Sequence, residues 1–248
     1  MEILSGKYSA VFDGLMLHAR LAGYQEILVD LGAGDGRYVR TVARASPTWF
    51  AIGVDASREP LQAVSRMAPP NALYVIANAL ALPIELTGLA SRITIICPWG
   101  SLLTALLEGQ PALLDGLRAI SRPGATLEVV LNETAVERAD RTLTTGGRQL
   151  AQALRDGGFR AGAGEPLDAA GLAAWPTSWA RRLAAGRRQG ALVVRATTPA
   201  LDDMAARPPP PGSTYWPPVM ARRHPARLTR SAQSSAATTR LSRLGTRR

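Results

Sequence analysis

Short apolar runs alternate with stretches of helical periodicity up to about residue 199, and this alternation constrains the fold more than any other feature. The runs that read as buried strands are Glu26–Leu31, Phe50–Val54, Leu73–Ile76, Ile93–Cys97, Thr126–Leu131 and Ala191–Arg195. Strands separated by helices are typical of βαβ units, whose strands run parallel. With 46% apolar residues over 248 positions, the chain can bury one such core. The sequence therefore predicts an α/β fold with a mostly parallel sheet and helices on both faces.

Helices are predicted over residues 8–21, 57–67 and 147–156. In the first of these, four apolar residues fall at helical spacing, which indicates an amphipathic helix packed on the sheet. They are Phe12, Leu15, Met16 and Ala19. Arg122-Pro123-Gly124 predicts a turn that leads into the fifth strand.

The chain is divided into two predicted parts by a change in composition and charge. Residues 1–199 hold 20 basic and 17 acidic residues, whereas residues 200–248 hold nine basic and two acidic ones. The second part contains Pro208–Pro211 and few large apolar side chains, too few to offset the entropy of ordering it. We expect a folded domain over 1–199 and a disordered basic tail, rich in Pro, Arg and Ser, over 200–248. The tail is interpreted as a solvated extension, with loose contacts to RNA phosphates as the alternative.

Cysteine and histidine usage excludes two classes of site. Cys97 is the only cysteine, and His18 and His224 lie far apart, so neither an intramolecular disulfide nor a zinc site is expected. The N-terminal residues lack a secretory signal, and no apolar stretch is long enough to span a membrane. We expect a soluble, cytoplasmic, monomeric protein without a metal.

A glycine-dense turn follows the first predicted strand. Gly32, Gly34 and Gly36 form a G-x-G-x-G pattern, and Asp30 lies at the end of the strand. Glycines allow the backbone to approach a ligand closely, and the next helix presents its positive N-terminus there. A pyrophosphate prefers G-x-G-x-x-G. The pattern therefore favours a zwitterionic adenosyl amino acid as the ligand.

Two further strand ends support a nucleoside site. Asp55 ends the second strand, where a carboxylate accepts hydrogen bonds from ribose hydroxyls. The alternative for Asp55 is a cap for the helix over residues 57–67. Asn78 and Ala79 end the third strand, where an amide and backbone groups are expected to meet the edge of an adenine.

Two tryptophans are candidates for holding a flat substrate. Trp99 follows Pro98 at the end of the fourth strand, and Trp179 precedes an arginine-rich stretch before the last strand. Two indoles on loops above one pocket can stack a flipped base while arginines hold phosphates. The alternative interpretation is that both tryptophans are packing residues and that the arginines form a solvated face.

Together the strand ends resemble the class I S-adenosylmethionine-dependent methyltransferases. That resemblance implies a seven-stranded sheet with an antiparallel last strand and the cofactor across the carboxyl ends of the strands. Three motifs narrow it further: Pro98–Leu103, Arg122–Ala125, and Thr177–Trp179 followed by Arg181–Leu183. These resemble the kanamycin–apramycin resistance family, which methylates N1 of adenine 1408 in 16S rRNA and confers aminoglycoside resistance.

The resemblance implies a role for each matching residue. Trp99 and Trp179 would stack the flipped adenine, and Arg182 and Arg187 would contact rRNA phosphates. The partner would be helix 44 of the 30S subunit. The S-adenosylmethionine pocket would be lined by Asp30, Gly32, Asp55 and Ser101.

Three departures from the family concern RNA docking. The family has a lysine-rich helix after the second strand, whereas residues 57–70 hold only Arg58 and Arg66 as cations. Gln189 replaces a basic residue, and the chain before Glu26 is expected to be too short for an N-terminal hairpin. Two alternatives therefore stay open: methylation of a small aromatic molecule, and a catalytically silent homologue.

Overall fold

The computed structural model describes residues 1–173, 175–177 and 190–200, which all belong to a unit formed by residues 1–208. Apart from Ala200, the predicted tail over 200–248 lies outside the described residues, and the predicted domain boundary at residue 199 therefore stays a prediction. The strands are β1 (Glu2–Ser5), β2 (Tyr8–Val11), β3 (Glu26–Leu31), β4 (Trp49–Asp55), β5 (Ala72–Ile76), β6 (Ala90–Ile96), β7 (Ser121–Asn132), β8 (Arg160–Ala161), β9 (Glu165–Leu167) and β10 (Ala191–Thr197). The helices are α1 (Gly14–Leu21), α2 (Arg37–Ala45), α3 (Arg58–Ser65), the 3₁₀ turn η1 (Ile84–Leu86), α4 (Gly100–Glu108), α5 (Pro111–Ile120), α6 (Glu133–Glu137), α7 (Leu143–Asp156) and α8 (Ala169–Ala173).

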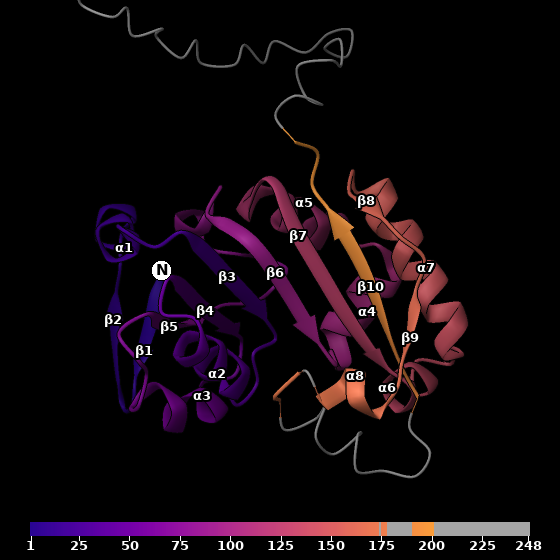
Figure 1. The fold of residues 1–248 in the computed structure, drawn as a ribbon, viewed down its shortest axis with the longest axis horizontal. Helices are drawn as coiled ribbons and strands as arrows, with labels where there is room; N and C mark the ends of the chain where they lie inside the picture. Colours follow the sequence, from indigo (N-terminus) through magenta and orange to yellow (C-terminus); the bar gives the residue numbers. More distant parts are fainter. Residues whose placement is uncertain (174, 178–189, 201–248) are drawn as a thin grey trace, which may run out of the picture. The chain divides into compact units, whose positions relative to one another are not determined.

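The described strands form one ten-stranded sheet in the order β2-β1-β5-β4-β3-β6-β7-β10-β8, and β9 also pairs with β10 (Figure 1). The five strands from β5 to β7 are parallel, and β10 is antiparallel to β7. All six predicted strands are confirmed, as are the α/β class and the antiparallel last strand. The count of seven was too low, because a hairpin extends the β5 edge and two short strands, β8 and β9, pair with β10.

Residues 8–21 do not form one helix, so that prediction was wrong. Tyr8–Val11 is a strand, and the helix begins after Asp13, whose side chain accepts a hydrogen bond from the backbone N–H of Met16 at 2.8 Å. The buried residues of α1 are Leu17 and Leu21, whereas Leu15 and Met16 are exposed. Of the four residues in the predicted apolar pattern, Leu15, Met16 and Ala19 are exposed, and Phe12 packs on the core from a position before the helix.

An N-terminal hairpin is present, although the chain before β3 was expected to be too short for one. β1 and β2 pair through a tight turn in which Ser5 lies opposite Tyr8, and Gly6 adopts a φ of 60°. The backbone N–H of Gly6 donates to the buried hydroxyl of Ser65 at 2.8 Å, which ties the hairpin to α3. A two-residue turn needs very little chain, and this is why 25 residues before β3 suffice for both a hairpin and a helix.

Helices cover both faces of the sheet. On one face, α2 and α3 pack on β4 and β5 through a cluster that includes Val39, Leu61 and Tyr74. On the other face, α1, α4, α5 and α7 pack on the central strands. The predicted helices over 57–67 and 147–156 correspond to α3 and α7, and α7 begins four residues early because Thr142 caps it.

Arg122-Pro123-Gly124 lies inside β7 as an irregularity rather than in a turn before it. Pairing with β6 passes from Ser121 opposite Ala90 to Thr126 opposite Arg92. Gly124 adopts a φ of 75°. Pro123 has no backbone N–H to donate to the neighbouring strand, so the regular pairing is interrupted here. The prediction of a separate turn was therefore wrong in position.

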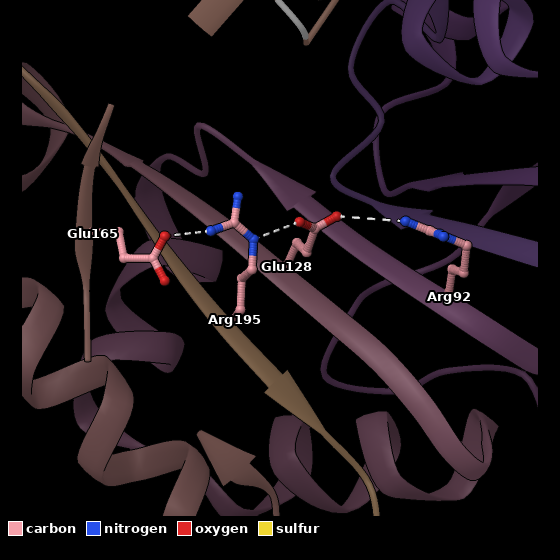
Figure 2. A network of polar contacts seen from close by, with 4 residues as sticks. All are labelled: Arg92, Glu128, Glu165 and Arg195. Carbon is pink, nitrogen blue, oxygen red and sulfur yellow. Dashed lines mark hydrogen bonds and ion pairs between the residues drawn. The ribbon is translucent and has the colours of Figure 1, made fainter. Parts of the chain in front are cut away.

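A charged network crosses β6, β7, β10 and β9 (Figure 2). The Arg195 guanidinium contacts Glu128 at 3.0 Å and also Glu165, while Arg92 lies 3.9 Å from the other Glu128 oxygen. Arg195 and Glu165 are largely exposed, so this network contributes little stability. None of the described helices is long and apolar enough to cross a membrane.

Candidate cofactor and substrate site

The parallel strands β3, β4, β5 and β6 end at the same edge of the sheet, where a cavity of about 1160 Å³ opens. The structure brings together at this cavity the eight described residues that the sequence assigned to the cofactor and to the flat substrate. They are Asp30, Gly32, Gly34, Asp55, Asn78, Ala79, Trp99 and Ser101. Their assembly follows from topology, because parallel strands present their carboxyl ends together.

The glycine turn after β3 takes backbone conformations that other residues avoid. Gly32, Gly34 and Gly36 have φ values of 71°, 55° and 65°. A Cβ at Gly36 would lie 2.6 Å from side-chain atoms of Tyr74 and Val64, so this glycine also permits close packing of α2. At Gly34 such an atom would meet nothing closer than 4.0 Å, so the turn leaves space on the cavity side there.

The Asp55 carboxylate is held by backbone donors. Gly34 donates its N–H to Oδ2 and Ser57 donates to Oδ1, both at 2.8 Å. Its donor Ser57 is the N-cap residue of α3, whereas a capping side chain accepts from the second or third helical N–H. Asp55 therefore fixes the loop between β4 and α3 and keeps a second lone pair on each oxygen for a ligand in the cavity.

Asp30 is the buried acid of the site, with 3% of its surface exposed. The Thr94 hydroxyl donates to Oδ1 at 2.7 Å. Burial raises the pKa of Asp30 to about 7, against the lowering effect of the Thr94 hydrogen bond, and the charges of Asp55 and Asp35 raise it further. A cation bound nearby would favour the ionised form.

The described residues that line the cavity carry more negative than positive charge. Asp30, Asp35 and Asp55 face one cation, Arg37, which forms an ion pair with Asp35 at 3.3 Å. Three carboxylates would repel an anionic pyrophosphate, whereas they would attract the sulfonium and ammonium groups of a cationic ligand. The glycine turn supplies the close backbone approach. The site therefore fits S-adenosylmethionine.

Asn78 and Ser101 lie where the sequence predicted. The Asn78 side-chain oxygen accepts the N–H of Leu80 at 2.9 Å, which orients the amide in the loop after β5. Ser101 stands in the first turn of α4 on the cavity wall. Their predicted roles toward the cofactor remain predictions.

Trp99 combines both interpretations that the sequence left open. Its half-buried ring packs against the main core and also lines the cavity. The guanidinium of Arg138, which follows α6, lies 5.2 Å from the ring centroid. The preceding Cys97 has a φ of 52°, which ends β6 and turns the chain into the cavity wall. No sequence signal pointed to Arg138, because it lies 39 residues downstream on another element.

Comparison with known proteins identifies the family. The family model described as NpmA, 16S rRNA (adenine(1408)-N(1))-methyltransferase, matches residues 2–198. This chain belongs to that family. A 16S rRNA (adenine(1408)-N(1))-methyltransferase from Streptoalloteichus tenebrarius is 30% identical over 203 residues, covering 75% of this chain and 94% of its own length. The enzyme of the same description from Streptoalloteichus hindustanus is 34% identical over 180 residues, covering 66% and 83%.

Solved structures of class I methyltransferases match the same part of the chain. The 16S rRNA methyltransferase KamB superposes with a TM-score of 0.73 at 29% identity, covering 80% of this chain and all of KamB. A point mutant of the 16S rRNA (adenine(1408)-N(1))-methyltransferase from Catenulisporales acidiphilia, solved with its cosubstrate SAM, gives a TM-score of 0.71 at 28% identity, covering 82% and 99%.

The RNA-contacting residues expected from the family lie partly outside the described structure. Trp179, Arg182, Arg187 and Gln189 fall in the undescribed stretch 178–189. Thr177, directly before it, lines the cavity.

The two cations after β4 are both engaged with the hairpin. Arg58 pairs with Glu2, and the side chain of Arg66 packs on Gly6. Both cations of residues 57–70 therefore contact the N-terminal hairpin in this structure.

Proposed function

We propose that this protein transfers a methyl group from S-adenosylmethionine to N1 of adenine 1408 in 16S rRNA and thereby confers aminoglycoside resistance. The observation that carries the proposal is the family match over residues 2–198, together with the cavity in which the predicted cofactor residues meet. The substrate form is the assembled 30S subunit, in which helix 44 presents the adenine. The protein acts on ribosomes in the cytoplasm, as a monomer.

Each part of the cavity wall suits one part of the methyl donor. Asp55 accepts hydrogen bonds from the ribose hydroxyls, while Asn78 and Ala79 meet the adenine edge. Asp30 and the glycine turn face the cationic amino-acid end. Ser101 and Trp99 line the cavity on the side that follows β6. The base to be methylated enters on this side.

Bound S-adenosylmethionine supplies a methyl group activated by its sulfonium sulfur. Adenine N1 carries an in-plane lone pair and no proton, so the N1–C bond forms as the C–S bond breaks, and the bonding electrons return to sulfur. No general base is required, and the contribution of the protein is alignment of the reacting atoms. Cys97 also lines the cavity, but burial raises the pKa of its thiol to about 12. The thiol therefore stays protonated and is a poor nucleophile.

Stacking compensates for extracting the base. Flipping a nucleotide costs a few kcal/mol, and each base–aromatic contact returns about 1–3 kcal/mol. Trp99 supplies one wall, and Trp179 is proposed to supply the other. Arg182 and Arg187 are proposed to hold the adjacent phosphates, so that docking depends on salt while base placement does not.

The test is methyl incorporation from labelled S-adenosylmethionine into purified 30S subunits, naked 16S rRNA and a panel of small aromatic molecules. We expect label in 30S subunits and much less in naked rRNA. Label only in a small aromatic would replace the rRNA substrate with the alternative from the sequence. Cofactor binding with no label in any substrate would indicate a silent homologue. An Asp55→Ala variant serves as the cofactor-deficient control.

A further inference from the structure

Arg138 reaches the tryptophan that is proposed to stack the target base, although the proposed reaction assigns this arginine no role. Its guanidinium carbon lies over the indole of Trp99, 5.2 Å from the ring centroid. The negative face of a tryptophan ring attracts a cation within about 6 Å. Trp99 lines the cavity, whereas Arg138 is not among the described residues that line it. The arginine therefore contacts the indole from outside the cavity.

The helix that carries Arg138 to the indole is fixed in place. Arg138 directly follows α6, and the buried Asn132 caps the other end of this helix, where its side-chain oxygen accepts the N–H of Ala135 at 2.8 Å. Val136 of α6 is fully buried, and a Cβ added at Gly146 of α7 would lie 2.9 Å from it. This close packing prevents α6 from moving toward α7. The guanidinium thus reaches the indole from a rigid support.

The backbone of Trp99 is also fixed, but its ring is not enclosed. Cys97 and Gly100 have positive φ values of 52° and 55°, and Trp99 between them is extended at the N-terminus of α4. The half-buried ring packs on the main core and also lines the cavity. Rotation about the side-chain torsions of Trp99 would move the ring within the cavity. Arg138 opposes this rotation, because the ring would have to leave the cation.

No described carboxylate competes with the indole for Arg138. The arginine is exposed, and it forms no ion pair with any of the described residues. Arg141, three residues further on, is exposed as well, but its Nη1 donates to the backbone carbonyls of Asp140 at 3.1 Å and Ala139 at 3.4 Å. The two arginines carry the same charge close together in the chain. A difference between their variants therefore reports the contact of Arg138 with the ring.

We propose that Arg138 is a positioning residue for methyl transfer, which holds the Trp99 ring in the orientation that stacks the target base. The inference rests on the proposed function, because the stacked base is taken to be the adenine of 16S rRNA. Methyl transfer requires N1 to lie in line with the methyl carbon and the sulfonium sulfur. A ring that rotates more freely places the base in line less often. Loss of the cation therefore slows the transfer step and leaves docking and cofactor affinity unchanged.

The first test follows the Trp99 ring in the free protein by fluorine NMR after labelling with a fluorinated tryptophan. The chain holds five tryptophans, and the signal of Trp99 is the one that disappears in Trp99→Phe. We expect this signal to shift and broaden in Arg138→Met, which keeps the length of the side chain and removes its charge. It should stay near its wild-type position in Arg138→Lys, which keeps a cation, and in the control Arg141→Met. An unmoved Trp99 signal in a folded Arg138→Met variant overturns the inference.

The second test measures single-turnover methylation of 30S subunits at saturating enzyme and S-adenosylmethionine, together with the dissociation constant for 30S subunits at several salt concentrations. Arg138→Met should lower the single-turnover rate about threefold, as expected for an exposed cation–π contact, and Arg138→Lys should restore most of it. Arg141→Met should keep the wild-type rate, and the two methionine variants should bind 30S subunits and cofactor equally well.

A different result for Arg138→Met would assign the arginine to the RNA instead. If 30S binding weakens more than in Arg141→Met and the single-turnover rate is unchanged, Arg138 contacts a phosphate and the inference is overturned. A wild type that binds S-adenosylmethionine but never methylates 30S subunits contradicts the proposed function. The fluorine spectra need no substrate, so they decide separately whether Arg138 holds the ring.

Discussion

At the scale of single residues, the two acids of the cofactor site differ in environment. Asp55 is half-buried and accepts two backbone N–H bonds, whereas Asp30 is buried and receives one hydroxyl. Both were predicted from their places at strand ends, because such positions converge in a parallel sheet. The burial of Asp30 and its Thr94 partner could not be predicted, since Thr94 lies on a different strand 64 residues away.

Asp55→Ala should weaken S-adenosylmethionine binding by about 1–3 kcal/mol, because two ribose hydroxyls lose a charged acceptor. Titration calorimetry measures this, and circular dichroism checks that the variant is folded. Unchanged affinity in a folded variant would defeat the assignment of Asp55 to the ribose.

Asp30→Asn should change how stability depends on pH. In the unfolded chain the carboxyl titrates near its ordinary pKa of 3.8, and in the folded protein its pKa is about 7. Between these values the folded state holds the extra proton, so wild-type stability falls as pH rises through this window and stays low above it. Asparagine cannot ionise. The free energy of unfolding of the variant, relative to that of the wild type, should therefore rise by about 2–3 kcal/mol between pH 5 and pH 8. Urea unfolding at both pH values tests this, and a constant difference would contradict it.

At the scale of elements, the segment before β3 shows where periodicity misleads. Residues 12–19 present a helical apolar pattern, yet the burial of α1 rests on Leu17 and Leu21, and the first residues form a hairpin. β3, β4 and β5 were predicted to within one residue at each end because they are apolar on both faces. β6 begins three residues and β7 begins five residues before the predicted start. β2 is exposed along its whole length, so its sequence carries no such signal.

The glycine turn offers a test at this scale. Gly36→Ala should lower stability by about 1–3 kcal/mol, since a Cβ would meet Tyr74 and Val64 at 2.6 Å where φ is positive. Gly14→Ala, at the start of α1 where no atom lies within 4 Å, is the matched control and should be neutral or slightly stabilising. Equal melting temperatures for the two variants would contradict the packing argument.

At the scale of the whole molecule, the alternation of apolar runs with helical stretches was enough to predict the parallel core of the sheet. It was also enough to predict the sheet edge at which the site lies. The outer strands were not predictable, because β8 and β9 are only two and three residues long. The basic stretch 200–248 lies beyond the family match, which ends at residue 198.

Deleting residues 200–248 should leave the melting temperature nearly unchanged, because that stretch lacks the apolar residues to join a core. The same deletion should make RNA binding less sensitive to salt, since nine cations are removed. Scanning calorimetry and filter binding at several salt concentrations measure the two effects. A large fall in melting temperature would show that the folded domain extends past residue 199.

The most direct test of the account maps the modified nucleotide. Wild-type protein, Trp99→Phe and Trp99→Ala are incubated with 30S subunits and S-adenosylmethionine, and reverse transcription of 16S rRNA is then read for a stop at adenine 1408. A methyl on N1 blocks base pairing, so we expect a strong stop with wild type, a partial one with Trp99→Phe and none with Trp99→Ala, while all three bind the cofactor equally. A full stop with Trp99→Ala would make the indole a packing residue, and no stop at 1408 with wild type would contradict the proposed function itself.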